Sequence, residues 1–106
     1  MVEETEVVSG SNSKVRVVQL SPNAPAVNIS IDNQELFANV KYMDVTPYIA
    51  IQAKEYTVNL EEARTNRIMR QNKVKINPGR IYTFYAVGSI PNVKIIQSLD
   101  GATFMN

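Results

Sequence analysis

Two apolar runs with a period of two residues, joined by a proline-containing link, dominate residues 14–31. Apolar side chains at every second position lie on one face of a β-strand, and residues 27–31 alternate in this way. Pro22 and Pro25 cannot donate hydrogen bonds to a sheet. Residues 21–26 are therefore predicted to form a rigid loop or a crossover between two strands.

The first of these runs changes phase. Val15 and Val17 alternate on one face, whereas Val18 and Leu20 fall on the other. Such a switch is typical of a β-bulge, or of a strand that passes from one sheet to another. We expect one of these features near Val18.

Turn signals divide the rest of the chain at short intervals. Asp32-Asn33 can supply the positive φ angles of a tight hairpin. In Asn77-Pro78-Gly79-Arg80, proline sets one central residue and glycine accepts a positive φ at the next. Gln52–Glu55 is read as a further turn. These turns predict antiparallel neighbours.

Together the patterns predict seven or eight short strands and no helix. A helix over residues 61–73 is rejected because Ala63, Ile68 and Met69 form no helical stripe. Residues 81–87 are apolar on both faces, as expected of a central strand, and Tyr82 resembles a tyrosine corner. The predicted fold is an all-β, immunoglobulin-like antiparallel β-sandwich, with a closed β-barrel as the alternative. The predicted strands are residues 14–20, 27–31, 34–37, 48–51, 55–60, 68–76, 81–87 and 93–99.

The length of 106 residues predicts one domain. Residues 1–13 are acidic and Ser-rich and are predicted to be a flexible tail or linker. The β-sandwich domain is assigned to residues 14–100, and residues 101–106 to a C-terminal tail. No signal peptide and no apolar run long enough to span a membrane is visible in the sequence.

The chain has no histidine and no cysteine. The commonest general base, the commonest zinc ligands and the thiol nucleophile are therefore missing. A Ser-Lys pair is the remaining hydrolytic option, and no serine is singled out for it. We expect a protein that is not an enzyme and that has no cofactor. Asp32, Asp44 and Asp100 fall at predicted turns without the spacing of a calcium loop, so no metal site is predicted.

A basic stretch contains six of the 11 basic residues within 17 positions and no acidic residue. It could bind an anionic polymer, or its charges could protect an edge strand from aggregation. A step of three along a strand alternates faces, so its residues are not expected to form one patch. Stacking aromatics are absent, which disfavours nucleic acid. The candidate ligand-binding residues are Arg64, Arg67, Arg70, Lys73, Lys75 and Arg80.

Four segments carry a resemblance to a bacterial domain-of-unknown-function family, number 4397: Val15–Val27, Ile31–Val40, Val45–Tyr48 and Pro78–Gly88. The resemblance implies a β-sandwich of exported or cell-envelope proteins, often in tandem copies, without an established activity. Two positions depart from the family pattern: Gln19 stands where the family usually has histidine, and Lys54 where it has glycine. The family's signature loop contributes four candidate contact residues: Ser21, Pro22, Asn23 and Pro25.

Two functional hypotheses follow. The first is a binding or spacer module of an envelope or exported protein, whose partner is an anionic cell-wall polymer or another protein. The second is a small intracellular or coat-associated structural protein that forms homo-oligomers through its sheet edges. The five tyrosines could instead line a carbohydrate-binding face, although without tryptophan they are read as core residues.

Overall fold

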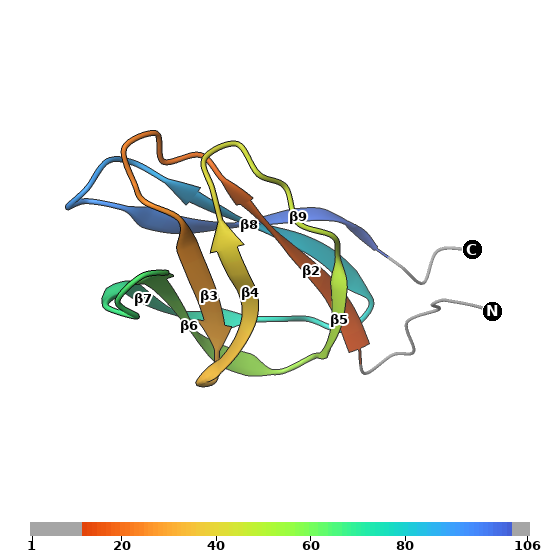
Figure 1. Cartoon of the computed structure of the whole chain (residues 1–106). Helices are drawn as coiled ribbons and strands as arrows, with labels where there is room; N and C mark the ends of the chain where they lie inside the picture. Colours follow the sequence, from red (N-terminus) through yellow and green to blue (C-terminus); the bar gives the residue numbers. More distant parts are fainter. Residues whose placement is uncertain (1–11, 103–106) are drawn as a thin grey trace.

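A computed structural model describes residues 12–102, which form two stacked four-stranded sheets without a helix (Figure 1). The predicted sandwich is confirmed, and the sheets do not close into a barrel. The strands are β2 (Asn12–Gln19), β3 (Val27–Ile31), β4 (Gln34–Val40), β5 (Ile49–Gln52), β6 (Glu55–Glu62), β7 (Ile68–Lys75), β8 (Arg80–Val87) and β9 (Lys94–Ala102).

One sheet has the order β5-β2-β8-β9, and the other has the order β4-β3-β6-β7. Neighbouring strands are antiparallel with one exception, because β2 pairs with β8 in parallel. The antiparallel sandwich that was predicted thus contains one parallel pair, which the sequence did not indicate. A period of two residues places side chains on faces but does not specify which distant strand becomes the neighbour.

Two predicted turns have the expected backbone. Asp32 and Asn33 have φ angles of 50° and 66°, which a two-residue hairpin between β3 and β4 requires. Gly79 has a φ of 68° at the turn before β8. Tyr82 makes the contact that defines a tyrosine corner, a hydrogen bond between its hydroxyl and the backbone a few residues upstream. The hydroxyl accepts this bond from the Asn77 amide at 3.1 Å.

The core lies between the sheets and is filled by alternate aliphatic and aromatic side chains. The predicted central strand β8 lies between β2 and β9 and contributes Phe84, which is 1% exposed. Fully burying an apolar side chain such as Val, Leu, Ile or Phe contributes about 1.5–3 kcal/mol of transfer free energy. The core residues are Val15, Val17, Val27, Ile29, Ile31, Phe37, Val40, Tyr56, Val58, Leu60, Val74, Ile76, Tyr82, Phe84, Ala86, Val93 and Ile95.

Two expectations along the chain are wrong in detail. β2 keeps a continuous register against β8 past Val18, without a bulge or a change of sheet. Val18 is buried on the outer side because Val45 pairs beside it in an isolated bridge. At the other end, Gly101 and Ala102 belong to β9 rather than to the predicted tail. Asn12 and Ser13, which were assigned to the N-terminal tail, belong to β2. The rest of the two predicted tails, residues 1–11 and 103–106, lies outside the described residues.

The two ends of the sandwich differ. Asn12 and Ala102, the limits of the described chain, lie at the end where Arg80 pairs with Ala102 and Asn12 pairs with Gln52. Strand directions place four connecting segments at the opposite end, residues 20–26, 63–67, 88–93 and the first part of the β4–β5 connection, residues 41–45 (Figure 1). We call these four connections the distal loops.

Candidate binding surface

The signature loop is the hub of the distal loops. The Ser21 hydroxyl donates a hydrogen bond to the Gly88 carbonyl at 2.6 Å. The Ile90 amide donates to Oδ1 of Asn23 at 3.2 Å. Ser21 is buried, whereas Pro22 and Asn23 are exposed. The loop therefore fixes residues 88–93 in place and presents its own tip to solvent.

Two further connections are tied to the same hub. The Ala63 amide donates to the Ala26 carbonyl at 2.9 Å, which fixes the turn between β6 and β7. The Met43 amide donates to the Gln19 carbonyl at 2.7 Å, which fixes the connection between β4 and β5. All four distal loops are thus held together by hydrogen bonds, although they lie far apart in the sequence.

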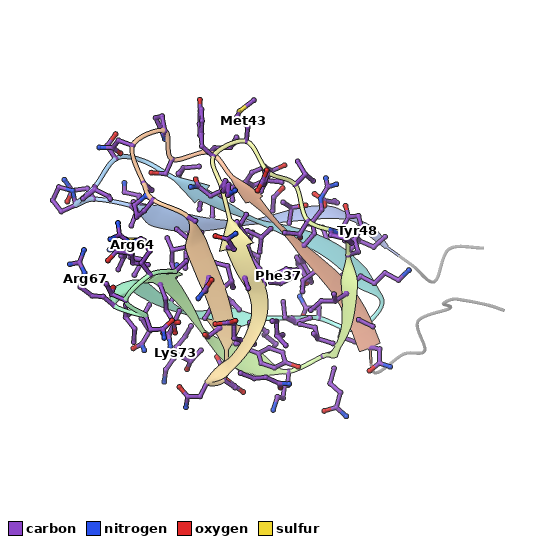
Figure 2. All side chains as sticks on the ribbon, viewed as in Figure 1. Phe37, Met43, Tyr48, Arg64, Arg67 and Lys73 are labelled. Atoms are coloured by element: carbon purple, nitrogen blue, oxygen red, sulfur yellow. The ribbon has the colours of Figure 1, made fainter. Side chains whose placement is uncertain are left out.

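The distal loops and their flanks carry most of the exposed large apolar side chains of residues 12–102. Six of nine lie there: Leu20, Tyr42, Met43, Val45, Ile68 and Ile90. Met43 is 63% exposed and has a φ of 76° (Figure 2), a backbone region that costs a non-glycine residue about 1–2 kcal/mol. Exposed apolar clusters and strained backbone both gather at interaction sites. The sequence did not indicate this cluster because its residues come from separate loops.

Gln19 lies directly beneath the hub and is fully buried. Its side-chain Oε1 accepts a hydrogen bond from the Ser21 amide at 2.5 Å. Within residues 12–102, its Nε2 has no hydrogen-bond acceptor. A buried unsatisfied donor costs about 1–3 kcal/mol.

The basic residues do not form one surface. Arg64 and Arg67 are exposed in the distal turn between β6 and β7 (Figure 2). Arg70 pairs with the core residue Leu60, whereas Lys73 pairs with Thr57 on the opposite face of the sheet.

Lys75 pairs with Glu55 and shares the outer face with Lys73. Arg80 belongs to the other sheet, at the end away from the distal loops, and its Nη1 donates to the Pro78 carbonyl at 3.4 Å. The structure therefore joins Arg64 and Arg67 to the signature loop and separates Lys73, Lys75 and Arg80 from it.

A cluster that the sequence did not indicate lies on the outer face of the β5-β2-β8-β9 sheet. A bulge in β9 leaves Asp100 unmatched between the pairs Ile81–Gly101 and Tyr82–Leu99. Its carboxylate accepts hydrogen bonds from the hydroxyls of Thr83 and Tyr48.

The Thr83 hydroxyl, which is fully buried, also accepts from Nε of Arg16 at 2.9 Å. The Arg16 guanidinium lies 4.7 Å from the centre of the Tyr48 ring. Partial burial, followed by the hydrogen bond to Asp100, raises the pKa of Tyr48. The cluster fastens the end of β9 and the segment before β5 onto the sheet.

A cleft of about 380 Å³ separates the edge strands β4 and β5. Leu36, Ile49 and Ile51 contribute aliphatic lining. At its mouth, Nζ of Lys54 lies 3.6 Å from Asp32 and 5.1 Å from the centre of the Tyr56 ring. Burial and the negative charge of Asp32 raise the pKa of Tyr56.

The three aspartates that were considered as metal ligands each accept hydrogen bonds from different donors. Asp32 accepts from the Thr57 amide, Asp44 from the Lys41 amide, and Asp100 from its hydroxyl partners. Among residues 12–102, no three histidine, cysteine, aspartate or glutamate side chains gather as metal ligands would. The same part of the chain contains no helix that could span a membrane.

The fold and the surface define a β-sandwich domain whose connections at one end form a joined, partly apolar surface. The chain belongs to the family described as a domain of unknown function, DUF4397, whose model matches residues 13–103. No curated protein matches the chain.

Proposed function

We propose that this chain is a non-enzymatic binding module of an exported or cell-envelope protein, and that it contacts its partner through the distal loops. The observation that carries the proposal is the gathering of six exposed large apolar side chains around one hydrogen-bonded hub. Rigid scaffolds commonly present binding residues on loops of this kind. The exported or envelope setting rests on the family resemblance.

The roles of the buried serines support a function other than catalysis. The Ser13 hydroxyl donates to the Asn77 carbonyl at 2.5 Å, and that of Ser21 donates to a carbonyl in the hub. The Ser30 hydroxyl donates to the Glu61 carboxylate at 2.9 Å. These hydroxyls are used for structure, and none of them contacts a lysine that could activate it.

The sheet edges carry features that oppose the alternative of self-association. β4 has two irregularities in its register against β3, and β7 and β9 each have one. Bulges and charged side chains protect edge strands from pairing. The edges of β7 and β9 are also linked, since Gln97 Nε2 donates to the Lys75 carbonyl and Asn72 Nδ2 donates to the Ile95 carbonyl.

Site-specific photo-crosslinking in the source cells tests the proposal. A photoreactive amino acid at Met43 or Ile90 is expected to give an adduct with a partner in the envelope fraction. The same amino acid at Ile96 or Leu99, which are 50% and 60% exposed away from the distal loops, is the matched control. Adducts of twice the chain mass from Ile96 or Leu99 would favour self-association, and adducts from no position would favour a spacer.

The cleft between β4 and β5 supports a second candidate, the binding of a small ligand. Its volume of about 380 Å³ is within the range of small-molecule sites. Ile51→Lys would place a charge in the cleft without touching the distal loops. If the cleft is the functional site, this variant loses partner or ligand binding while Met43→Ser retains it, and the opposite result favours the distal loops.

A further inference from the structure

A small apolar slot opens among the distal loops, between the start of β7 and residues 88–93. Its volume is about 150 Å³. Engineered apolar cavities of this volume bind benzene, so the slot has room for one aliphatic side chain. The residues that line it are Arg67, Ile68, Met69, Ile90, Pro91 and Val93.

Five of the six residues that line the slot are apolar, although the lining also exposes polar atoms, those of Arg67 among them. Ile68 is 50% exposed and Ile90 is 36% exposed, whereas Val93 at the base is buried. An aliphatic side chain that enters the slot would remove apolar surface of both isoleucines from water, which favours binding. The slot is rigid on one side because the Ile90 amide is bonded to Asn23.

The turn beside the slot carries two exposed cations. Arg67 lines the slot, and Arg64 lies in the same turn. The nearby acidic side chain, Glu62, lies 3.9 Å from Nε of Arg67 and accepts a hydrogen bond from the Thr65 hydroxyl at 2.8 Å. A second acidic side chain, Glu61, is the strand partner of Ile68 and accepts a hydrogen bond from the Ser30 hydroxyl at 2.9 Å. Glu62 thus offsets Arg67, and among residues 12–102 Arg64 has no ion pair.

We propose that the slot and its cations bind a short acidic peptide segment of a partner protein, with one aliphatic side chain in the slot and carboxylates against Arg64 and Arg67. This inference rests on the proposed function and names the class of partner. A polysaccharide or polyphosphate would use the charges but has no aliphatic side chain for the slot. The combination of apolar slot and flanking arginines therefore favours a peptide.

The heptapeptide Val-Glu-Glu-Thr-Glu-Val-Val, the sequence of residues 2–8 of this chain, has the required chemistry and serves as the probe. Fluorescence anisotropy with the labelled, capped peptide and the full 106-residue chain measures binding. We expect saturable binding that weakens as salt rises. Arg67→Ser and Ile68→Ser are each expected to weaken it by about tenfold, the loss that corresponds to one good contact.

Two control variants make the same chemical changes elsewhere. Lys73→Ser removes a cation from the outer face of the sheet, and Ile96→Ser removes an equally exposed isoleucine from β9. Both are expected to leave the affinity for the peptide unchanged. Circular dichroism and urea unfolding of each variant establish that it is folded.

Two results would overturn the inference. One is binding of poly-glutamate as tight as that of the heptapeptide and insensitive to Ile68→Ser, which would assign the surface to charge alone. The other is no binding of the heptapeptide to the folded wild-type chain at low salt. If crosslinks from Met43 and Ile90 still form in cells, the proposed function stands and only the peptide assignment fails.

Discussion

Gly88 tests whether the hub of the distal loops depends on one backbone conformation. Its φ is 88°, and a Cβ atom placed there would lie 2.7 Å from the Asn92 carbonyl oxygen. The left-handed backbone costs an alanine about 1–2 kcal/mol. Moving the Asn92 carbonyl adds a cost of the order of overpacking, about 1–3 kcal/mol. Gly88→Ala is therefore expected to destabilise the fold by about 2–5 kcal/mol.

Urea unfolding measures this cost. With a slope of about 2 kcal/mol per molar urea, the midpoint should fall by roughly 1–2.5 M. Gly101→Ala in β9 is the matched control, because a Cβ there meets no heavy atom within 4 Å. It should be neutral or stabilising by up to about 1 kcal/mol. Equal midpoints for the two variants would refute the argument from φ and close approach.

Three other perturbations have defined outcomes. Thr83→Val removes the buried hydroxyl that joins Arg16 to Asp100, and it should lower the free energy of unfolding in urea by about 1–3 kcal/mol. The control is Thr57→Val, whose hydroxyl bonds no described residue and which should change stability by less than about 0.5 kcal/mol. Equal effects of the two variants would contradict a structural role for the cluster. Met43→Gly relieves a positive φ at an exposed residue and should stabilise the fold by about 0.5–1 kcal/mol. The control, Ala50→Gly at an exposed position of β5, should destabilise the fold by a similar amount. A loss of stability for Met43→Gly would mean that the Met43 side chain supports the fold. The pKa values of Tyr48 and Tyr56 are both raised, so the folded state favours the neutral hydroxyls. Their contribution to the free energy of unfolding is complete below a pH of about 10, and it is lost as the pH rises through the raised pKa values. Unfolding free energies from pH 8 to 11 should therefore fall less steeply for a Tyr48→Phe, Tyr56→Phe double variant than for the wild type or Tyr42→Phe, and parallel curves would contradict the assignment.

Local features of the fold could be predicted because local chemistry decides them. Asp32 and Asn33 are consecutive residues that both tolerate a positive φ angle, and Pro78-Gly79 forms a turn whatever the rest of the chain contains. The alternation of residues 27–31 and the turn positions were enough to predict a sandwich. Val18 was misread because periodicity records which face a side chain is on, but not whether another segment covers that face.

The candidate site depends on pairing between distant strands. Single candidate residues could therefore be predicted from the sequence, whereas their arrangement in space could not. Asp100 reaches Thr83 because a bulge redirects its side chain, and no residue pattern marked that bulge. The alternation of strand faces already predicted that the basic stretch would not form one patch, but the sequence did not indicate which of its members lie at the distal loops. Its members separate in space because β7 alternates its faces and Arg80 belongs to the other sheet.

The slot shows why local sequence patterns and non-local strand pairing are both needed to locate a binding site. Arg67 and Ile90 come from connections on different sheets, and they line one slot because β7 and β9 are the adjoining edges of the two sheets. The same adjacency places the signature loop beside them, since Asn23 bonds Ile90 and Ala26 bonds Ala63. A change in the Ser21–Pro25 loop should therefore alter peptide affinity without touching the slot. Asn23→Ala, which removes the acceptor for the Ile90 amide, is expected to weaken binding of the heptapeptide by less than Ile68→Ser does, and an unchanged affinity would show that the slot keeps its shape without the loop.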